Sequence, residues 1–266
     1  MKKYKYIALS TLTFVLLFSE NILSQNINNS LGLNVFNSFA FWEDPYQKGG
    51  YDNLGIGTYL SPTYKMNINK YYFQLDFMLS YFHFIGPDGL TRTGPDDDID
   101  FGFHSHINRN DLGIKVGYNL LDNLTLLIES KYIYLQIKGS VDRTEIIQSL
   151  FDYIERGFLL GPGINLNYPK KSSNSYFSLS ASYLMGNLNY TYNSFNIQAS
   201  AYPIRDKITT QLLSTNLGYN IHLNSKFLLG VSLESNYFFK RKFTYDYNYD
   251  SNLWFIGLST SIFYQL

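Results

Sequence analysis

Apolar residues alternate with polar or small ones over ten segments, and this alternation is the most constraining feature of the sequence. Apolar residues at every second position are typical of β-strands, because successive side chains of a strand point to opposite faces. The segments span residues 31–41, 54–60, 71–81, 112–120, 124–134, 158–168, 177–185, 213–221, 227–239 and 254–266. The alternation predicts an all-β chain of ten strands.

The glycines provide an independent check on this register. Twelve of them share the face opposite the apolar residues: Gly32, Gly55, Gly57, Gly113, Gly117, Gly157, Gly161, Gly163, Gly186, Gly218, Gly230 and Gly257. Ser, Asn and charged residues lie on that face too. A soluble barrel needs a packed apolar interior. A transmembrane barrel instead turns its apolar face to lipid and its polar face to the lumen, which is the pattern found here.

The connections between the predicted strands alternate in length. Residues 66–70, 121–123, 169–175 and 223–226 are expected to be short turns, and residues 43–52, 86–108, 139–156, 187–210 and 242–252 long loops. Tyr and Phe gather at both ends of the apolar stretches, like the aromatic girdles of membrane barrels. We therefore predict a ten-stranded antiparallel transmembrane β-barrel with short periplasmic turns and long extracellular loops.

Residues 117–129, GYNLLDNLTLLIE, have the pattern of a strand, a turn and a strand, and residues 254–266 form a closing strand. With these features the chain resembles the small outer-membrane β-barrel proteins of Gram-negative-type bacteria, of the eight- to twelve-strand class. Members usually end in Phe or Trp, whereas this sequence ends in Leu266. The resemblance implies a place in the cell outer membrane, contact with its lipid and lipopolysaccharide, and insertion by the barrel assembly machinery. The alternative, a secreted β-sandwich or a soluble ligand-binding barrel, would expose the apolar stripes to water.

The first residues have the organisation of a signal peptide. Lys2, Lys3 and Lys5 precede an apolar stretch, residues 7–18, that is too short to span a bilayer. Cleavage after Ser24 would separate a signal peptide, residues 1–24, from one barrel domain, residues 25–266. An uncleaved anchor helix is the alternative, but it needs a longer apolar run.

Composition excludes several classes of function. The chain has no cysteine, and therefore no disulfide, thiolate metal site or Cys nucleophile. Its 21 basic and 21 acidic residues leave no basic excess for nucleic acid. It contains no phosphate-binding glycine loop, GxSxG or HExxH motif. The sequence thus establishes no catalytic role, and we expect no cofactor.

Five charged residues of the polar face are expected to meet inside the barrel: Asp76, Lys115, Glu129, Lys131 and Glu234. With a three-residue turn at 121–123, Lys115 would lie directly opposite Glu129. Interior charges need partners where little water is present, so one interpretation is a set of structural ion pairs that fills a narrow lumen. The alternative is a constriction that selects small solutes.

The predicted loop 86–108 combines acidic residues with histidines: Asp96, Asp97, Asp98, Asp100, His104 and His106. Two His separated by one residue face the same way on an extended segment, and with carboxylates they can bind a divalent metal or activate water. Because the spacing provides no third ligand, a solvated acidic loop is the simpler interpretation and the one we expect.

Two further expectations concern the loop side of the barrel. Residues 144–155 carry apolar residues at helical spacing after a start that resembles a capping box, which predicts a short amphipathic helix. Ten basic residues, Arg109 among them, are expected on this side, where the phosphates of lipopolysaccharide would meet them.

Three functions fit this architecture. The protein is a surface protein with a passive structural or narrow-pore role, an adhesin that binds host or matrix ligands through its loops, or a rim hydrolase acting on proteins or lipid A. We expect the first, because no hydrolase motif of the class is matched residue by residue and a fold alone does not determine function.

Overall fold

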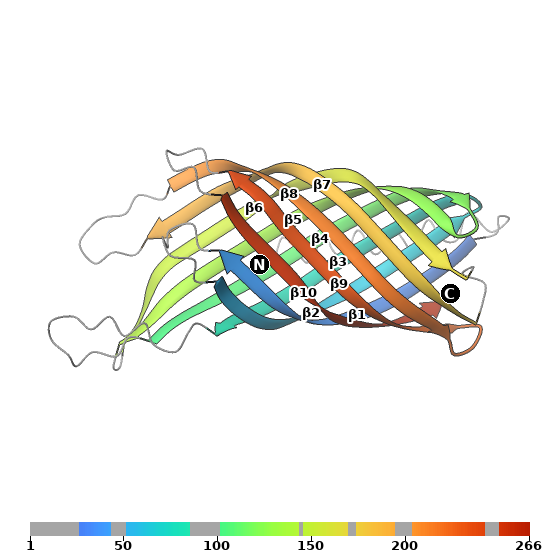
Figure 1. Cartoon of the computed structure of the whole chain (residues 1–266), viewed down its shortest axis with the longest axis horizontal. Helices are drawn as coiled ribbons and strands as arrows, with labels where there is room; N and C mark the ends of the chain where they lie inside the picture. The colour runs from blue at the N-terminus through green and yellow to red at the C-terminus, as the bar shows by residue number, and fades with distance from the viewer. Residues whose placement is uncertain are drawn as a thin grey trace.

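The structure is a computed structural model that describes residues 27–43, 52–85, 102–143, 146–169, 174–194, 204–242 and 250–266. Ten long strands account for nearly all of them (Figure 1): β1 (Ile27–Glu43), β2 (Asp52–Ile68), β3 (Tyr71–Ile85), β4 (Gly102–Leu121), β5 (Leu124–Arg143), β6 (Ile146–Tyr168), β7 (Ser175–Ser194), β8 (Ile204–His222), β9 (Phe227–Lys242) and β10 (Asp250–Gln265). Within these ranges no helix is long and apolar enough to cross a membrane.

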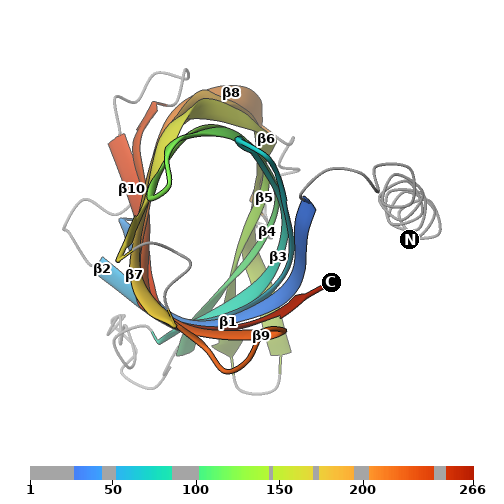
Figure 2. The ribbon, with the colours of Figure 1, turned by 90° about the vertical axis from the view of Figure 1, so that its right-hand side faces the viewer.

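The strands form a closed barrel because the first pairs with the last. β1 pairs with β2 along one side and with β10 along the other, from Ser30 opposite Gln265 to Trp42 opposite Leu253. Every other strand pairs antiparallel with its neighbours in the chain, and Figure 2 shows the ring end-on. Closure leaves no unpaired sheet edge, which a sheet that spans a membrane requires. The prediction of a ten-stranded antiparallel barrel is confirmed.

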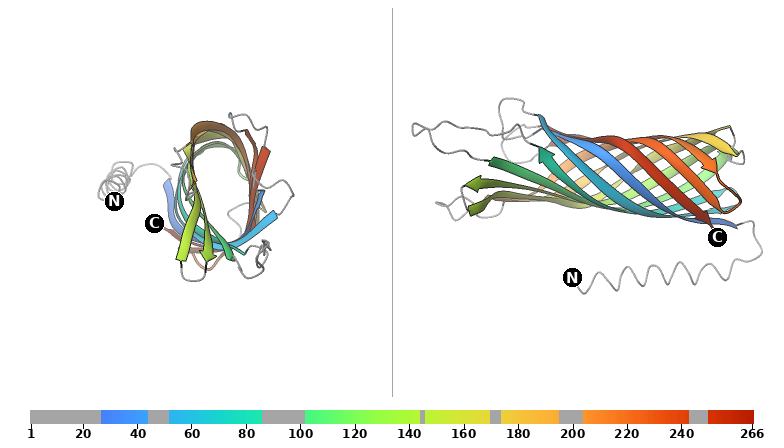
Figure 3. Two further views of the ribbon diagram at one scale, coloured as in Figure 1. Left: turned by 90° about the vertical axis from the view of Figure 1, so that its left-hand side faces the viewer. Right: turned by 90° about the horizontal axis from the view of Figure 1, so that it is seen from below.

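Short turns gather at one end of the barrel, which we call the turn end. Asn69 and Lys70 join β2 to β3, and Asp122 and Asn123 join β4 to β5. Asn69 has a φ of 53°, a left-handed conformation that Asn tolerates better than most residues. The start of β1 and the end of β10 lie at this end as well (Figures 1 and 3). The opposite end, where β1 ends and β2 begins, is the loop end.

The outward side chains form an exposed apolar band around the barrel. Leu60 is 48% exposed, Ile128 62% and Leu258 60%, although each lies in the middle of a paired strand. Aromatic pairs flank the band: Tyr71–Tyr118, Phe177–Tyr219 and Phe227–Tyr264 at the turn end, and Phe41–Trp254, Tyr132–Phe158 and Tyr237–Trp254 at the loop end. An apolar band between two aromatic girdles is the surface that a barrel presents to a lipid bilayer.

Half of the strands continue past the loop-end girdle. Strands β4 to β8 contain 19–23 residues, whereas the other five contain 15–17. The predicted loops were therefore too long, since residues 102–108, 139–143, 146–156, 187–194 and 204–210 belong to strands. Polar residues such as Asn108, Gln136 and Asn189 cover the outside of these extensions. The apolar alternation reports contact with lipid, so it stops before the strands do.

The predicted helix over residues 144–155 is wrong. Residues 146–155 are the first part of β6, and they pair with β5 from Ile146 opposite Arg143 to Glu155 opposite Leu135. From Phe151 onward, β6 pairs with β7 too. Pairing with β5 along the segment, and also with β7 from Phe151 onward, satisfies backbone hydrogen bonds, so it prevails over the weak local preference for a helix.

The inward face changes character along the barrel. It is polar near the turn end, as predicted, but near the loop end fifteen buried side chains, none more than 3% exposed, form an apolar layer: Ala40, Phe82, Ile107, Ile133, Leu135, Ile137, Leu159, Leu184, Leu188, Tyr190, Ile208, Leu212, Phe238, Leu253 and Phe255. The prediction of a polar inner face on every strand is wrong for this half. Strands that extend beyond lipid have water outside, so they need the packed apolar interior of a soluble barrel.

Candidate functional site

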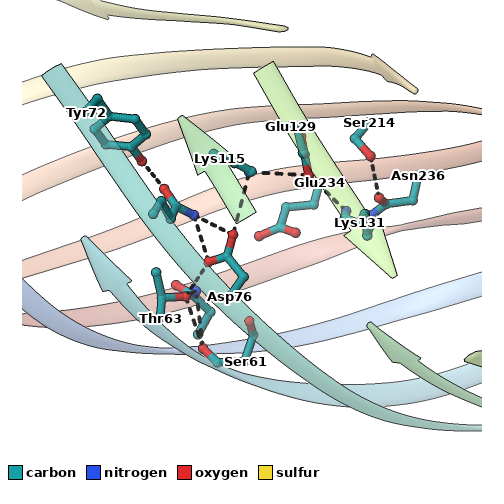
Figure 4. A network of polar contacts seen from close by, with 12 residues as sticks. Ser61, Thr63, Tyr72, Asp76, Lys115, Glu129, Lys131, Ser214, Glu234 and Asn236 are labelled. Carbon is teal, nitrogen blue, oxygen red and sulfur yellow. Dashed lines mark hydrogen bonds and ion pairs between the residues drawn. The ribbon is translucent and has the colours of Figure 1, made fainter. Parts of the chain in front are cut away.

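Four of the five predicted lumen charges form one chain of ion pairs (Figure 4). Lys115 lies opposite Glu129 in the register of β4 and β5. The Lys115 Nζ is 3.9 Å from Glu129 Oε1 and 3.8 Å from Asp76 Oδ2 on β3. Lys131 Nζ lies 3.3 Å from the same oxygen of Glu129. Acidic and basic groups thus alternate over three adjacent strands.

Neutral donors hold the Asp76 end of this chain. Gln74 donates to both carboxylate oxygens of Asp76 at 2.7 Å, and the Thr63 hydroxyl donates to Oδ1 at 2.8 Å. The Tyr72 hydroxyl donates in turn to the side-chain oxygen of Gln74. These donors and the nearby ammonium group of Lys115 hold the orientation of the half-buried carboxylate.

Glu234, the fifth predicted charge, is held differently. It lies on β9 and accepts a hydrogen bond from the hydroxyl of Tyr59 on β2. Since β1 and β10 separate these two strands in the ring, the bond crosses the lumen. Within the described part of the chain, no ion pair within 4.0 Å joins Glu234 to a lysine.

An ion pair that the sequence analysis did not predict lies at the inner surface of the apolar layer. Arg109 and Asp111 are 1% and 3% exposed, and Arg109 Nη2 lies 2.5 Å from Asp111 Oδ2, with a second hydrogen bond from Nε at 3.0 Å. The guanidinium lies 4.9 Å from the ring centroids of both Phe238 and Phe255. Arg109 was expected among the loop-side cations. Arg109 lies at every second position with Asp111, Gly113 and Lys115 along β4, and this alternation was the signal that it faces inward.

These charges line a polar chamber, a cavity of about 240 Å³ between the apolar layer and the turn end. Its lining includes four acidic and four basic residues: Asp76, Asp111, Glu129, Glu234, Lys65, Arg109, Lys115 and Lys131. Tyr176, Leu228 and Phe263 form a smaller buried cluster toward the turn end, and Lys65 Nζ lies 3.8 Å from the centroid of the Phe263 ring. The balanced charge gives the chamber no preference for cations or anions.

The two histidines predicted as metal ligands lie on a strand. His104 and His106 belong to β4 and occupy alternate positions of that strand, in step with the outward-facing Leu112 and Ile114. Asp96, Asp97, Asp98 and Asp100 lie outside the described residues. Of the two histidine side chains the structure describes only that of His106, whose Nδ1 is 3.1 Å from the hydroxyl of Tyr81. Among the side chains it describes, no group of three His, Asp or Glu is placed to hold a metal ion.

Comparison with known proteins identifies the architecture. The sequence matches no protein-family model and no curated protein. Outer membrane protease OmpT from Escherichia coli superposes with a TM-score of 0.58 over 92% of this chain and 99% of its own, at 10% identity. This is the fold of an outer-membrane β-barrel. The translocator domain of autotransporter NalP from Neisseria meningitidis matches 100% of this chain and 98% of its own, at 10% identity and a TM-score of 0.47.

The lipid-facing band and this fold together make the chain an outer-membrane β-barrel protein. At 10% identity the likeness to OmpT concerns the fold alone, and no residue role passes from that protease to this chain. The adhesin and hydrolase hypotheses depend chiefly on the surface connections, residues 44–51, 86–101, 195–203 and 243–249, which lie outside the described residues.

Proposed function

We propose that the protein is a passive surface barrel with a closed lumen, whose role is structural. The observation that carries this proposal is the apolar layer, in which side chains from strands that are not neighbours in the ring meet across the lumen. Phe82 on β3 and Phe255 on β10 lie with ring centroids 4.9 Å apart, and each is 1% exposed. Such contacts leave no water-filled path from the polar chamber to the loop end.

The layer is thick enough to stop ions. Along β5 it includes Ile133, Leu135 and Ile137, four residue steps that cover about 13 Å of strand at ~3.3 Å per residue. With strands tilted by about 40°, this corresponds to about 10 Å along the barrel axis. The layer is largely apolar, although the buried Glu155 is the register partner of Leu135 and Tyr190 at its level. An ion among the apolar side chains loses most of its hydration, at a cost of many kcal/mol.

Single-channel recording of the refolded protein in planar bilayers tests the proposal. We expect no conductance steps above the bilayer baseline. The double variant Phe82→Ala/Phe255→Ala removes two rings from the layer and should produce intermittent steps as water enters. Phe77→Ala, which removes a ring that is 43% exposed on the lipid face, is the matched control and should stay silent.

The same recordings separate the closed barrel from the narrow-pore alternative. Steady steps from the unmodified protein that change with Glu129→Lys would overturn closure, because Glu129 would then lie on a conducting path. The absence of conductance steps from the unmodified protein and from Glu129→Lys supports a structural role.

Lipopolysaccharide is the partner we propose for the outward cations above the loop-end girdle. Arg156 on β6 and Lys207 on β8 stand in one cross-strand row, each opposite Asn189 on β7. The row lies one outward position beyond Phe158, so its charges are at the level of lipid headgroups. A signal peptide over residues 1–24, outside the described residues, and insertion by the barrel assembly machinery belong to the same proposal.

A further inference from the structure

Three of the four histidines of the chain come together on the β3–β4 pair. His83 on β3 is the register partner of His106 on β4, and His104 stands two residues from His106 on the same face. Residues directly opposite in an antiparallel pair have Cβ atoms about 4.5–5.5 Å apart, and diagonal neighbours lie about 7–8 Å apart. The backbone alone thus places three histidines around one point of the outer surface.

We propose that His83, His104 and His106 form a binding site for a divalent transition metal of the Zn²⁺ type. Neutral imidazole is the commonest metal ligand in proteins. Three histidines with one position left open to water are an established Zn²⁺ ligand set, with Zn–N distances of about 2.0–2.1 Å. This site is independent of the closed lumen, because it lies on the outer face of the barrel.

The surroundings of His106 suit a metal ligand. Its Nδ1 lies 3.1 Å from the Tyr81 hydroxyl, and the two rings are stacked with centroids 5.6 Å apart. When Nδ1–H donates to that hydroxyl, the lone pair lies on Nε2, which is then the nitrogen that binds the metal. Ligating histidines almost always donate their second ring N–H to a carboxylate, a backbone carbonyl or water, and the Tyr81 hydroxyl oxygen can accept this hydrogen bond in the same way.

The position along the barrel makes the site reachable from water. On the outward face, Tyr81 is an exposed aromatic of the loop-end girdle, and His83 follows it by two residues in the direction of the loop end. The site therefore lies at the boundary between lipid and the external medium. Metal ions from outside the cell can reach it without crossing the membrane.

One nearby charge opposes the metal. Lys138 on β5 is the register partner of His106 on its other side, and it is exposed. An ammonium group beside a dication raises the energy of the loaded site by Coulomb repulsion. Removing this charge should therefore increase the affinity for the metal, so the site can be tested by a substitution that strengthens binding as well as by ones that weaken it.

Calorimetric titration of the refolded full-length barrel with ZnCl₂ tests the site. We expect one ion per chain with a micromolar or lower dissociation constant. His83→Ala, His104→Ala and His106→Ala should each weaken binding by at least about tenfold, since losing even an outer partner of a ligand costs 10–100-fold. Lys138→Gln should strengthen binding. His222→Gln, which changes the remaining histidine on β8, is the matched control and should bind like the parent.

Cobalt provides a second readout that does not depend on heat. Co²⁺ bound by three histidines and water in near-tetrahedral geometry gives intense visible absorption bands, whereas the hexa-aqua ion absorbs only weakly, and each of the three substitutions should remove the intense bands. The proposal fails if His83→Ala binds Zn²⁺ as tightly as the parent, because only the strand register brings that residue to the site. Equal loss with His222→Gln would also overturn it.

Discussion

Replacing Asp111 with alanine is expected to destabilise the barrel by about 3–5 kcal/mol, the usual result of removing one partner from a buried ion pair. The substitution leaves the guanidinium of Arg109, which is 1% exposed, without its carboxylate at the edge of the apolar layer. The rings of Phe238 and Phe255, both centred 4.9 Å from the guanidinium, offer only weak compensation for a full charge. Urea unfolding in phospholipid vesicles, followed by the fluorescence of the two tryptophans, measures the effect.

The double variant Arg109→Met/Asp111→Leu is the control. It removes both charges and fills similar volume with apolar atoms, so it should recover most of the lost stability, because well-packed apolar replacements of buried ion pairs are often neutral. An unfolding free energy for Asp111→Ala within 1 kcal/mol of the parent protein would contradict the burial of this pair.

Gly161→Ala is expected to prevent normal closure between β6 and β7, or to cost at least about 3 kcal/mol, the upper part of the range for overpacking. A Cβ at this position would overlap the backbone oxygen of Tyr183, and Leu184 Cα lies only 3.0 Å away. The close approach occurs where the ladder of paired residues skips Gly161 and Pro162, with the same register on both sides of the gap. Pro162 lies in this gap and has no N–H to donate to the ladder.

Electrophoresis in SDS before and after boiling checks this expectation, because a closed barrel resists the detergent until it is heated and then changes its mobility. Gly161→Ala should give a much smaller fraction of the heat-modifiable form. Gly113→Ala provides the comparison, since its nearest neighbour would be Asp76 Cβ at 3.7 Å, an ordinary contact. Equal folded fractions for the two variants would show that strand proximity at Gly161 is not limiting.

The transmembrane part of the fold was predictable because lipid imposes a simple rule on each strand. Residues such as Leu112 and Ile114 must face outward, and Gly113 and Lys115 then face inward. The rule applies within one strand, so it needs no knowledge of the neighbours. The same parity, with a predicted three-residue turn at 121–123, placed Lys115 opposite Glu129. The structure has this pairing with a two-residue turn, Asp122 and Asn123, and a register irregularity between Asn119 and Leu121.

The alternation of outward apolar and inward polar residues applies only to the part of each strand that faces lipid. Beyond the girdle the outer face is polar and the inner face apolar, so the strand residues from 146 to 155 read as a helix and the start of β4 as a loop. Arg109 was assigned to the surface for the same reason, although it is buried against Phe238 and Phe255. The pattern of residues along one strand contains no information about contacts between side chains across the lumen.

The sequence by itself determined the number of strands, their inward and outward faces and the lipid-facing band, because these depend on alternation along one strand at a time. Only the tertiary structure decided which inward side chains meet across the lumen, because contacts such as Phe82 with Phe255 join strands far apart in the chain. It also decided that His83 stands opposite His106, since the register across a connection of sixteen residues, 86–101, follows from pairing along the whole strand and not from spacing in the sequence.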